Sequence, residues 1–205
     1  MKGKHVTLAV LASAAAVSTY WFVSSRAPAG QARYTLRRRD GLFELREYPE
    51  LLVAHTKVTE ASRDSAFHRL VRYLARANTS RMKIPMITPV LIDQAGGTAT
   101  MAMVLPEELE LDTVPRPVDP TVAVRRRPAA LMAVHRFSGP ANDVRETRAL
   151  TALRDWLTTQ GLEAAGEPTI AQYDSPVVPG PLRRYEVMIP VVETAAAAGQ
   201  ASETA

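Results

Sequence analysis

The sequence predicts an α+β fold: a distorted β-barrel made of two pseudo-symmetric strand–helix–hairpin repeats, with two helices packed outside. The first observation is an order of elements, a strand, a helix and two strands, that occurs within 34–106 and again within 121–192. The second is a local match, since RPAALMAV at 127–134 repeats the pattern of YPELLVAH at 48–55. A Pro-rich linker, 107–120, separates the halves.

Composition sets limits on function. The chain has 205 residues, 46% of them hydrophobic, which suits one folded domain and a monomer. It has no cysteine, so disulfides, thiolate catalysis, Cys-ligated zinc and iron–sulfur clusters are excluded. Three of its 25 basic residues and none of its 21 acidic residues lie in 1–29. The remaining 22 basic residues are balanced by the 21 acidic ones, so we expect no nucleic-acid partner.

The N-terminal segment is typical of export. Lys2, Lys4 and His5 form a charged start, and 6–23 is uncharged and mostly apolar. Ala-Pro-Ala at 27–29 offers a cleavage position. The apolar run is also close to the roughly 20 residues that span a bilayer. The sequence therefore predicts a periplasmic or extracellular protein, either soluble after signal cleavage or attached to the membrane through 6–23.

In the first half, a helix separates short strands. It can start at Ser62 or Asp64 and end near Asn78, and its core face carries Phe67, Leu70, Val71 and Leu74. A turn at Asp40-Gly41 joins the first two strands and another at 95–97 joins the last two. The expected strands are 34–38, 42–47, 51–58, 83–93 and 98–105.

The second half repeats this order. Its strand 127–134 is followed by a helix from Asn142 to about Thr159, which Gly161 ends. Strands 169–174 and 184–191 complete the repeat. An Ala/Gly/Ser-rich tail, 194–205, is predicted to be disordered. In the linker, the carboxylates of Glu107, Glu108 and Glu110 are read as a solvated loop, because an exposed loop does not desolvate them for acid–base chemistry.

Several short motifs, in this order, resemble the SOUL haem-binding protein family. They are ELREYP at 44–49, KIPMITPV at 83–90, VPRP at 114–117, YDSP at 173–176 and RRYEV at 183–187. The resemblance covers about 33–192. It implies a distorted barrel with two helices, related to the duplicated effector-binding domains of some transcription regulators. It also implies an open apolar groove for haem, or another tetrapyrrole, between the first helix and the loop joining the last two strands.

Carried onto this sequence, the groove has two walls. The helix wall is His68, Arg69 and Arg72, and the loop wall is Pro176, Val177, Val178, Leu182 and Arg183. The apolar loop residues would cover the macrocycle, and arginines would hold its propionates through charge-assisted hydrogen bonds. The alternative is that these arginines are an ordinary solvated helix face.

Histidines are candidate iron ligands. His68 lies one helical turn before Arg72, so we predict it as a tentative axial ligand, with a plain surface histidine as the alternative. His55 and His135 occupy related strands of the two halves. The repeat alignment places them on opposite faces, which argues against a bis-histidine site and favours hydrogen-bonded or exposed strand residues.

The expected function is non-enzymatic. No P-loop, G-x-S-x-G, H-E-x-x-H or dinucleotide-binding pattern occurs in the chain. We therefore expect reversible binding of haem or another tetrapyrrole, for carriage or buffering. The alternatives are an effector-type module for other amphipathic small molecules, or a protein-interaction domain whose groove takes an apolar peptide.

Overall fold

The computed structural model describes five stretches of the chain: 30–58, 63–95, 97–139, 142–174 and 178–193. The predicted export segment and the predicted disordered tail lie outside these residues. Neither of the α-helices within the described stretches has the length and apolar character that a membrane crossing requires.

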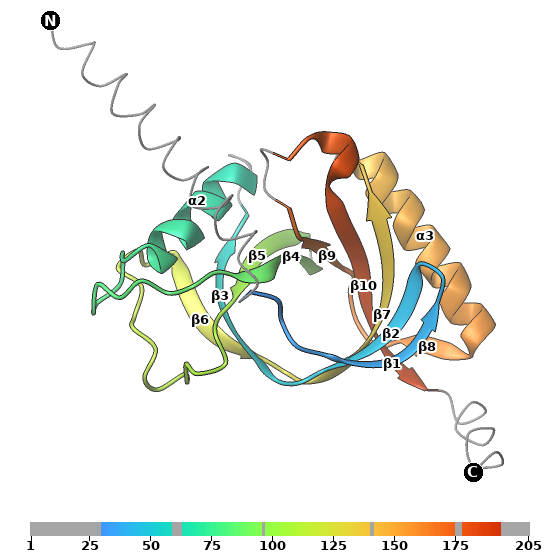
Figure 1. Cartoon of the computed structure of the whole chain (residues 1–205), viewed down its shortest axis with the longest axis horizontal. Helices are drawn as coiled ribbons and strands as arrows, with labels where there is room; N and C mark the ends of the chain where they lie inside the picture. The colour runs from blue at the N-terminus through green and yellow to red at the C-terminus, as the bar shows by residue number, and fades with distance from the viewer. Residues whose placement is uncertain (1–29, 59–62, 96, 140–141, 175–177, 194–205) are drawn as a thin grey trace, which may run out of the picture.

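A large antiparallel sheet with two α-helices makes up the described fold (Figure 1). The helices are α2 (Arg63–Leu74) and α3 (Asp143–Gln160), and a short 3-10 turn, η1, covers Gly180–Leu182. The ten strands are β1 (Thr35–Asp40), β2 (Phe43–Tyr48), β3 (Leu51–Lys57), β4 (Ile87–Ala95), β5 (Thr98–Val104), β6 (Val122–Arg127), β7 (Ala130–Ser138), β8 (Leu162–Ala164), β9 (Thr169–Gln172) and β10 (Arg184–Glu193).

The strand order is β1-β2-β7-β10-β9-β4-β5-β3-β6, with β8 paired to β10. The sheet is strongly curved, but within the described residues β1 and β6 remain its edges, so it is open where the sequence predicted a distorted barrel (Figure 1). The order is symmetric about the β9–β4 pair: β7-β10-β9 on one side matches β3-β5-β4 on the other. The matching order of strands in the two halves agrees with the predicted repeat, but the internal repeat itself remains a prediction.

Both helices cover the same face of the sheet. α2 packs on β3, β5 and β6, and α3 on β7, β8 and β10. Leu70 and Leu74 of α2 share one apolar cluster with Leu153 and Leu157 of α3, all fully or almost fully buried. A second cluster of buried residues, including Met132, lies on the face away from the helices. That second face carries the polar network described below.

Local chemistry explains the ends of α3, which match the prediction. The side chain of Asn142 accepts a hydrogen bond from the backbone N–H of Arg145 at 2.9 Å and caps the first turn. Gly161 ends the helix with φ 64°, a left-handed conformation that glycine adopts without steric cost.

The first helix is shorter than expected, and its predicted end near Asn78 is wrong. α2 stops at Leu74, and Ala75 then forms a β-bridge with Lys83. The Asn78 amide donates to the carbonyls of Tyr73 and Met82, at 3.1 and 2.7 Å. These bonds stabilise a turn in place of another helical turn.

Some strands also differ from expectation. β4 begins at Ile87, four residues later than the predicted start at Lys83. β6 and the short β8 were not predicted. β6 follows the Pro-rich linker and contains three consecutive arginines, so neither its composition nor its flanks indicate a strand.

Candidate functional site: a cavity over a buried ion-pair network

A cavity of about 640 Å³ lies where β7 ends and β10 begins. Residues of both faces of the sheet line it, because it lies at the end of these strands. Four of the lining residues are aromatic: Tyr34, Phe137, Tyr173 and Tyr185. Others carry charge or an imidazole: Arg46, His135, Arg136, Arg184 and Glu186. We call it the network cavity, after the hydrogen-bonded charges in its wall.

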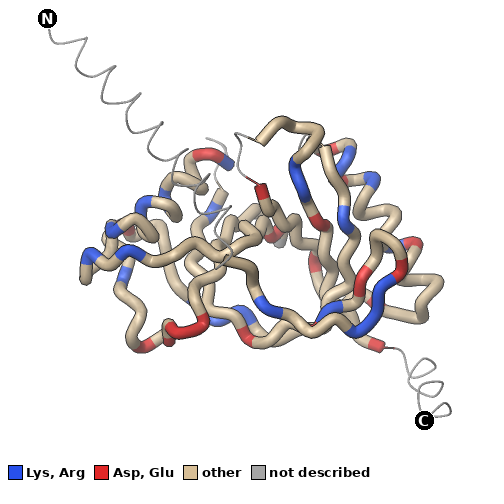
Figure 2. The backbone as a smooth tube through the Cα atoms, viewed as in Figure 1, with Lys and Arg blue, Asp and Glu red and all other residues tan. Residues whose placement is uncertain are grey.

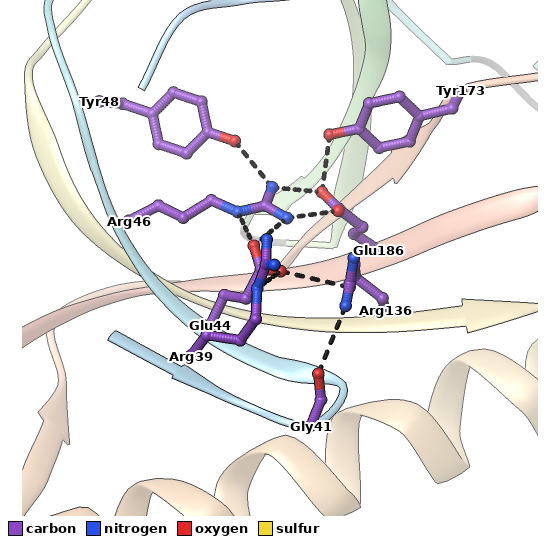
Figure 3. A network of polar contacts seen from close by, with 8 residues as sticks. All are labelled: Arg39, Gly41, Glu44, Arg46, Tyr48, Arg136, Tyr173 and Glu186. Carbon is purple, nitrogen blue, oxygen red and sulfur yellow. Dashed lines mark hydrogen bonds and ion pairs between the residues drawn. The ribbon is translucent and has the colours of Figure 1, made fainter. Parts of the chain in front are cut away.

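Arg46 is the centre of the network (Figure 3). Its guanidinium donates to both carboxylate oxygens of Glu186, at 2.7 and 2.8 Å, and through Nε to Glu44 at 2.7 Å. It also donates to the Tyr48 hydroxyl at 3.2 Å, and it lies 4.3 Å from the centroid of the Tyr34 ring. A buried charge needs such partners, because desolvation of an unpaired ion is very costly.

Two further arginines reach the network from the surface. Arg39 donates to Glu44 at 3.0 Å, and Arg136 lies 3.4 Å from the same carboxylate. Arg136 also donates to the carbonyl of Gly41 in the β1–β2 turn at 3.3 Å, while its Nε is buried without a hydrogen bond (Figure 3). Its side chain is 40% exposed, so it lies at the opening of the cavity.

The pKa values of Arg46 and of two tyrosines in the network are all raised. Burial lowers the pKa of Arg46, but its hydrogen bonds and attraction to Glu186 more than compensate, so the net pKa is raised. Burial raises the pKa of Tyr48 to about 12. It also raises the pKa of Tyr173, whose hydroxyl donates to Glu186 at 2.7 Å. At neutral pH the arginine is therefore charged and both phenols are protonated.

His135 is the lining residue that can offer a ring nitrogen to a ligand. Its Nδ1 lies 3.1 Å from the carbonyl oxygen of Ala149, and its ring stacks on Phe43 with centroids 4.5 Å apart. A carbonyl only accepts hydrogen bonds, so in the neutral imidazole Nδ1 carries the proton and Nε2 has the lone pair. His135 is thus a hydrogen-bonded strand residue, as predicted.

The predicted helix wall lies on α2, away from this cavity. His68 and Arg72 are exposed. Arg69 is half-buried and donates to the Thr56 hydroxyl at 3.2 Å and to the carbonyl of Lys57 at 2.7 Å. Its guanidinium is therefore engaged in docking α2 on β3.

The structure describes three of the five residues of the predicted loop wall. Pro176 and Val177 lie outside the described residues. Val178 is half-buried, Leu182 is 68% exposed, and Arg183 donates through Nε to the carbonyl of Val178 at 2.7 Å. In the part of the chain that the structure describes, none of five well-formed cavities combines a side chain of α2 with one of 178–183. The groove between these walls remains a prediction.

His55 and His135 lie on opposite faces of the sheet, as the repeat alignment predicted. His55 shares its face with Val53 of the second cluster, and His135 shares its face with Ala133 of the first. Burial, with a contribution from Arg125, lowers the pKa of His55. Within the described residues no group of three or more His, Asp or Glu side chains is arranged to hold a metal ion.

The sequence reasoning missed the network, although its members lie in motifs already noted. Glu44, Arg46 and Tyr48 occupy alternate positions of one strand and therefore share a face. Of the residues between them, Leu45 is buried and Glu47 is exposed. The alternation places the three polar side chains on one face, but it does not show that they are buried or that Glu186 is their partner.

Comparison with known proteins gives a family match over most of the chain. The family model described as SOUL heme-binding protein matches residues 29–190. No curated protein matches the chain significantly.

Solved structures share the fold. The crystal structure of the EcmrR C-terminal domain aligns with a TM-score of 0.57 and 12% identity, over 78% of this chain and 99% of that one. An uncharacterized conserved protein from Listeria innocua aligns with a TM-score of 0.56 and 12% identity, over 80% and 94%. A hydrolase from Listeria innocua aligns with a TM-score of 0.55 and 13% identity, over 76% and 94%. At these identities the likeness concerns the fold alone.

Proposed function

Because the chain belongs to the SOUL haem-binding family, we propose that it binds haem or another tetrapyrrole reversibly in the network cavity, for carriage or buffering. The supporting observation is a cavity of about 640 Å³ with four aromatic lining residues and half-exposed arginines at its opening. Pockets for organic ligands typically have volumes of roughly 300–1,000 Å³. The proposal assigns the chain no catalytic step.

The lining residues fit the chemistry of a porphyrin. Its flat faces gain roughly 25 cal/mol for each Å² of apolar surface buried. Its propionates require cations, and Arg136 is 40% exposed at the opening. Arg46 and Arg184 are less suitable, because the guanidinium of Arg46 already binds Glu44 and Glu186 and that of Arg184 already binds Asp174. Haem would supply an iron atom with open axial positions, and a neutral imidazole such as that of His135 is a suitable ligand for it.

The groove predicted from the sequence is the competing position for the same ligand. There, His68 would ligate the iron, Arg72 would hold a propionate and Val178 and Leu182 would cover the ring. Arg69 fits this role less well, since it already binds β3. We favour the network cavity because aromatic and basic side chains line one cavity there, whereas Leu182 of the loop wall is 68% exposed.

Haemin titration of residues 30–193, which contain the described fold, tests the proposal. We expect a saturable shift of the Soret band at micromolar protein. The absence of such a shift would contradict haem binding. Parallel titrations with metal-free protoporphyrin and with an unrelated hydrophobic cation separate the alternatives. Equal affinity for all three would favour an effector-type module for amphipathic molecules.

A further inference from the structure

Four arginines around the end of α2 form an exposed cluster, which we call the basic lobe. They are Arg72, Arg76, Arg81 and Arg116. None of them makes an ion pair or a side-chain hydrogen bond with another described residue. Two exposed arginines of the edge strands, Arg37 and Arg126, are instead paired with Glu47 and Glu50. Figure 2 shows the positive charges along α2 and the turn that follows it.

The fold holds this lobe in a defined shape. Thr79 donates its backbone N–H to the carbonyl of Arg116 at 2.9 Å, and its hydroxyl accepts from the Arg116 N–H at 3.2 Å. Arg72 is near one carboxylate, Asp119, whose lowered pKa is due first to hydrogen bonds from Thr121 and to a smaller extent to Arg72. The lobe therefore carries a net positive charge, fixed in position.

The chain enters the fold beside the segment that returns from the lobe. The carbonyl of Gly30 accepts hydrogen bonds from the backbone N–H and the hydroxyl of Thr88. Lys83, which pairs with Ala75 at the end of α2, precedes Thr88 closely in the chain. Residues 24–29 extend at most about 20 Å, so an apolar run 6–23 held in a bilayer would keep Gly30 within that distance of the headgroups.

We propose that the basic lobe binds the anionic headgroups of a phospholipid bilayer and so orients the domain on the membrane. Each arginine held near an anionic surface strengthens binding by about five-fold, and salt screens the attraction. Since the four side chains have no ion-pair partner among the described residues, they fit a surface that meets counter-charges outside this domain. The inference is independent of haem.

Hydrogen exchange of the full chain in lipid nanodiscs tests this inference. One set of discs contains phosphatidylcholine alone, and the other contains phosphatidylglycerol as well. We expect amides of 72–83 to exchange several-fold more slowly in the anionic discs, and this difference to disappear in high salt. Equal exchange in both discs would overturn the proposal, as would protection that persists in high salt.

Paired variants locate the effect. Arg76→Gln/Arg81→Gln should abolish the difference between the discs. Arg72→Gln/Arg116→Gln should do the same, and it leaves the two left-handed positions, Arg76 and Arg81, unchanged. The control is Arg148→Gln/Arg154→Gln, which removes two exposed arginines of α3 whose side chains have no partner in the described stretches. If the control variant loses protection equally, only net charge matters and the lobe is not the binding surface.

Discussion

Arg46 of β2 and Glu186 of β10 form a buried bidentate ion pair over a strand that lies between them. Their side chains are 2% and 7% exposed, and their two hydrogen bonds measure 2.7 and 2.8 Å. β7 separates β2 from β10 in the sheet, so the pair connects the N-terminal hairpin to the last strand. The hairpin lies at the start of the first predicted repeat, 34–106, whereas β7 and β10 belong to the second, so this pair connects the two halves.

Breaking this pair should destabilise the fold strongly. Glu186→Gln leaves the Arg46 guanidinium buried with reduced compensation, and we expect a loss of about 3–5 kcal/mol in the free energy of unfolding. Urea denaturation followed by circular dichroism measures it. The double variant Arg46→Met/Glu186→Met should recover part of this loss, because it leaves fewer uncompensated charges.

An exposed ion pair provides the control. Arg126 and Glu50 are about half exposed, so Arg126→Gln should leave the free energy of unfolding close to that of the wild type. A similar loss in Glu186→Gln and Arg126→Gln would mean that burial does not decide the energetics of these pairs.

Acid should weaken the fold partly through Asp174. Partial burial raises the pKa of this carboxyl, but hydrogen bonds from Arg184 outweigh it, and the net pKa is lowered below its ordinary value. The ionised form is thus favoured in the folded state. Its contribution to stability is complete above the unfolded pKa and is lost as pH falls through the folded pKa.

The matching variant is Asp174→Asn. It should be less stable than the wild type at pH 7, and this difference should shrink as the pH falls below about 4. Urea midpoints measured between pH 7 and pH 2 give the comparison, with Asp155→Asn on the exposed surface of α3 as the control. A difference that does not vary with pH would contradict the assignment.

Haem ligation should depend on which position the ligand occupies. With haem in the network cavity, His135→Ala should move the Soret band of the complex and His68→Ala should not. The reverse result would favour the groove predicted between α2 and the β9–β10 loop. Unchanged spectra in both variants would exclude these two histidines as ligands.

Propionate binding gives a second test of position. In the cavity, Arg136→Gln should weaken haemin binding by about three- to ten-fold, since it removes a charge-assisted hydrogen bond at a half-exposed site. Arg72→Gln is the matched change on α2 and should have no effect. Tryptophan quenching of the same titrations gives the dissociation constants.

The main elements could be predicted because their signals are local. The apolar spacing of Leu70, Val71 and Leu74 indicates the buried face of α2, and Asn142 and Gly161 give the ends of α3. The early end of α2 was missed, because it depends on Asn78 bonding to groups on both sides of the turn. The apolar periodicity of the helix gives no indication of these hydrogen bonds.

The sequence by itself determined the α+β class, the two helices, most of the strands and the family. Apolar periodicity, capping residues and ordered motifs depend on residues that are close together in the chain. They can therefore be recognised without knowing which strands or helices pack against one another. The tertiary structure alone decided where buried charge is neutralised and where the cavity opens. Arg46 meets Glu186 only after the sheet has placed β7 between their strands, and the low dielectric around them then makes their pairing obligatory.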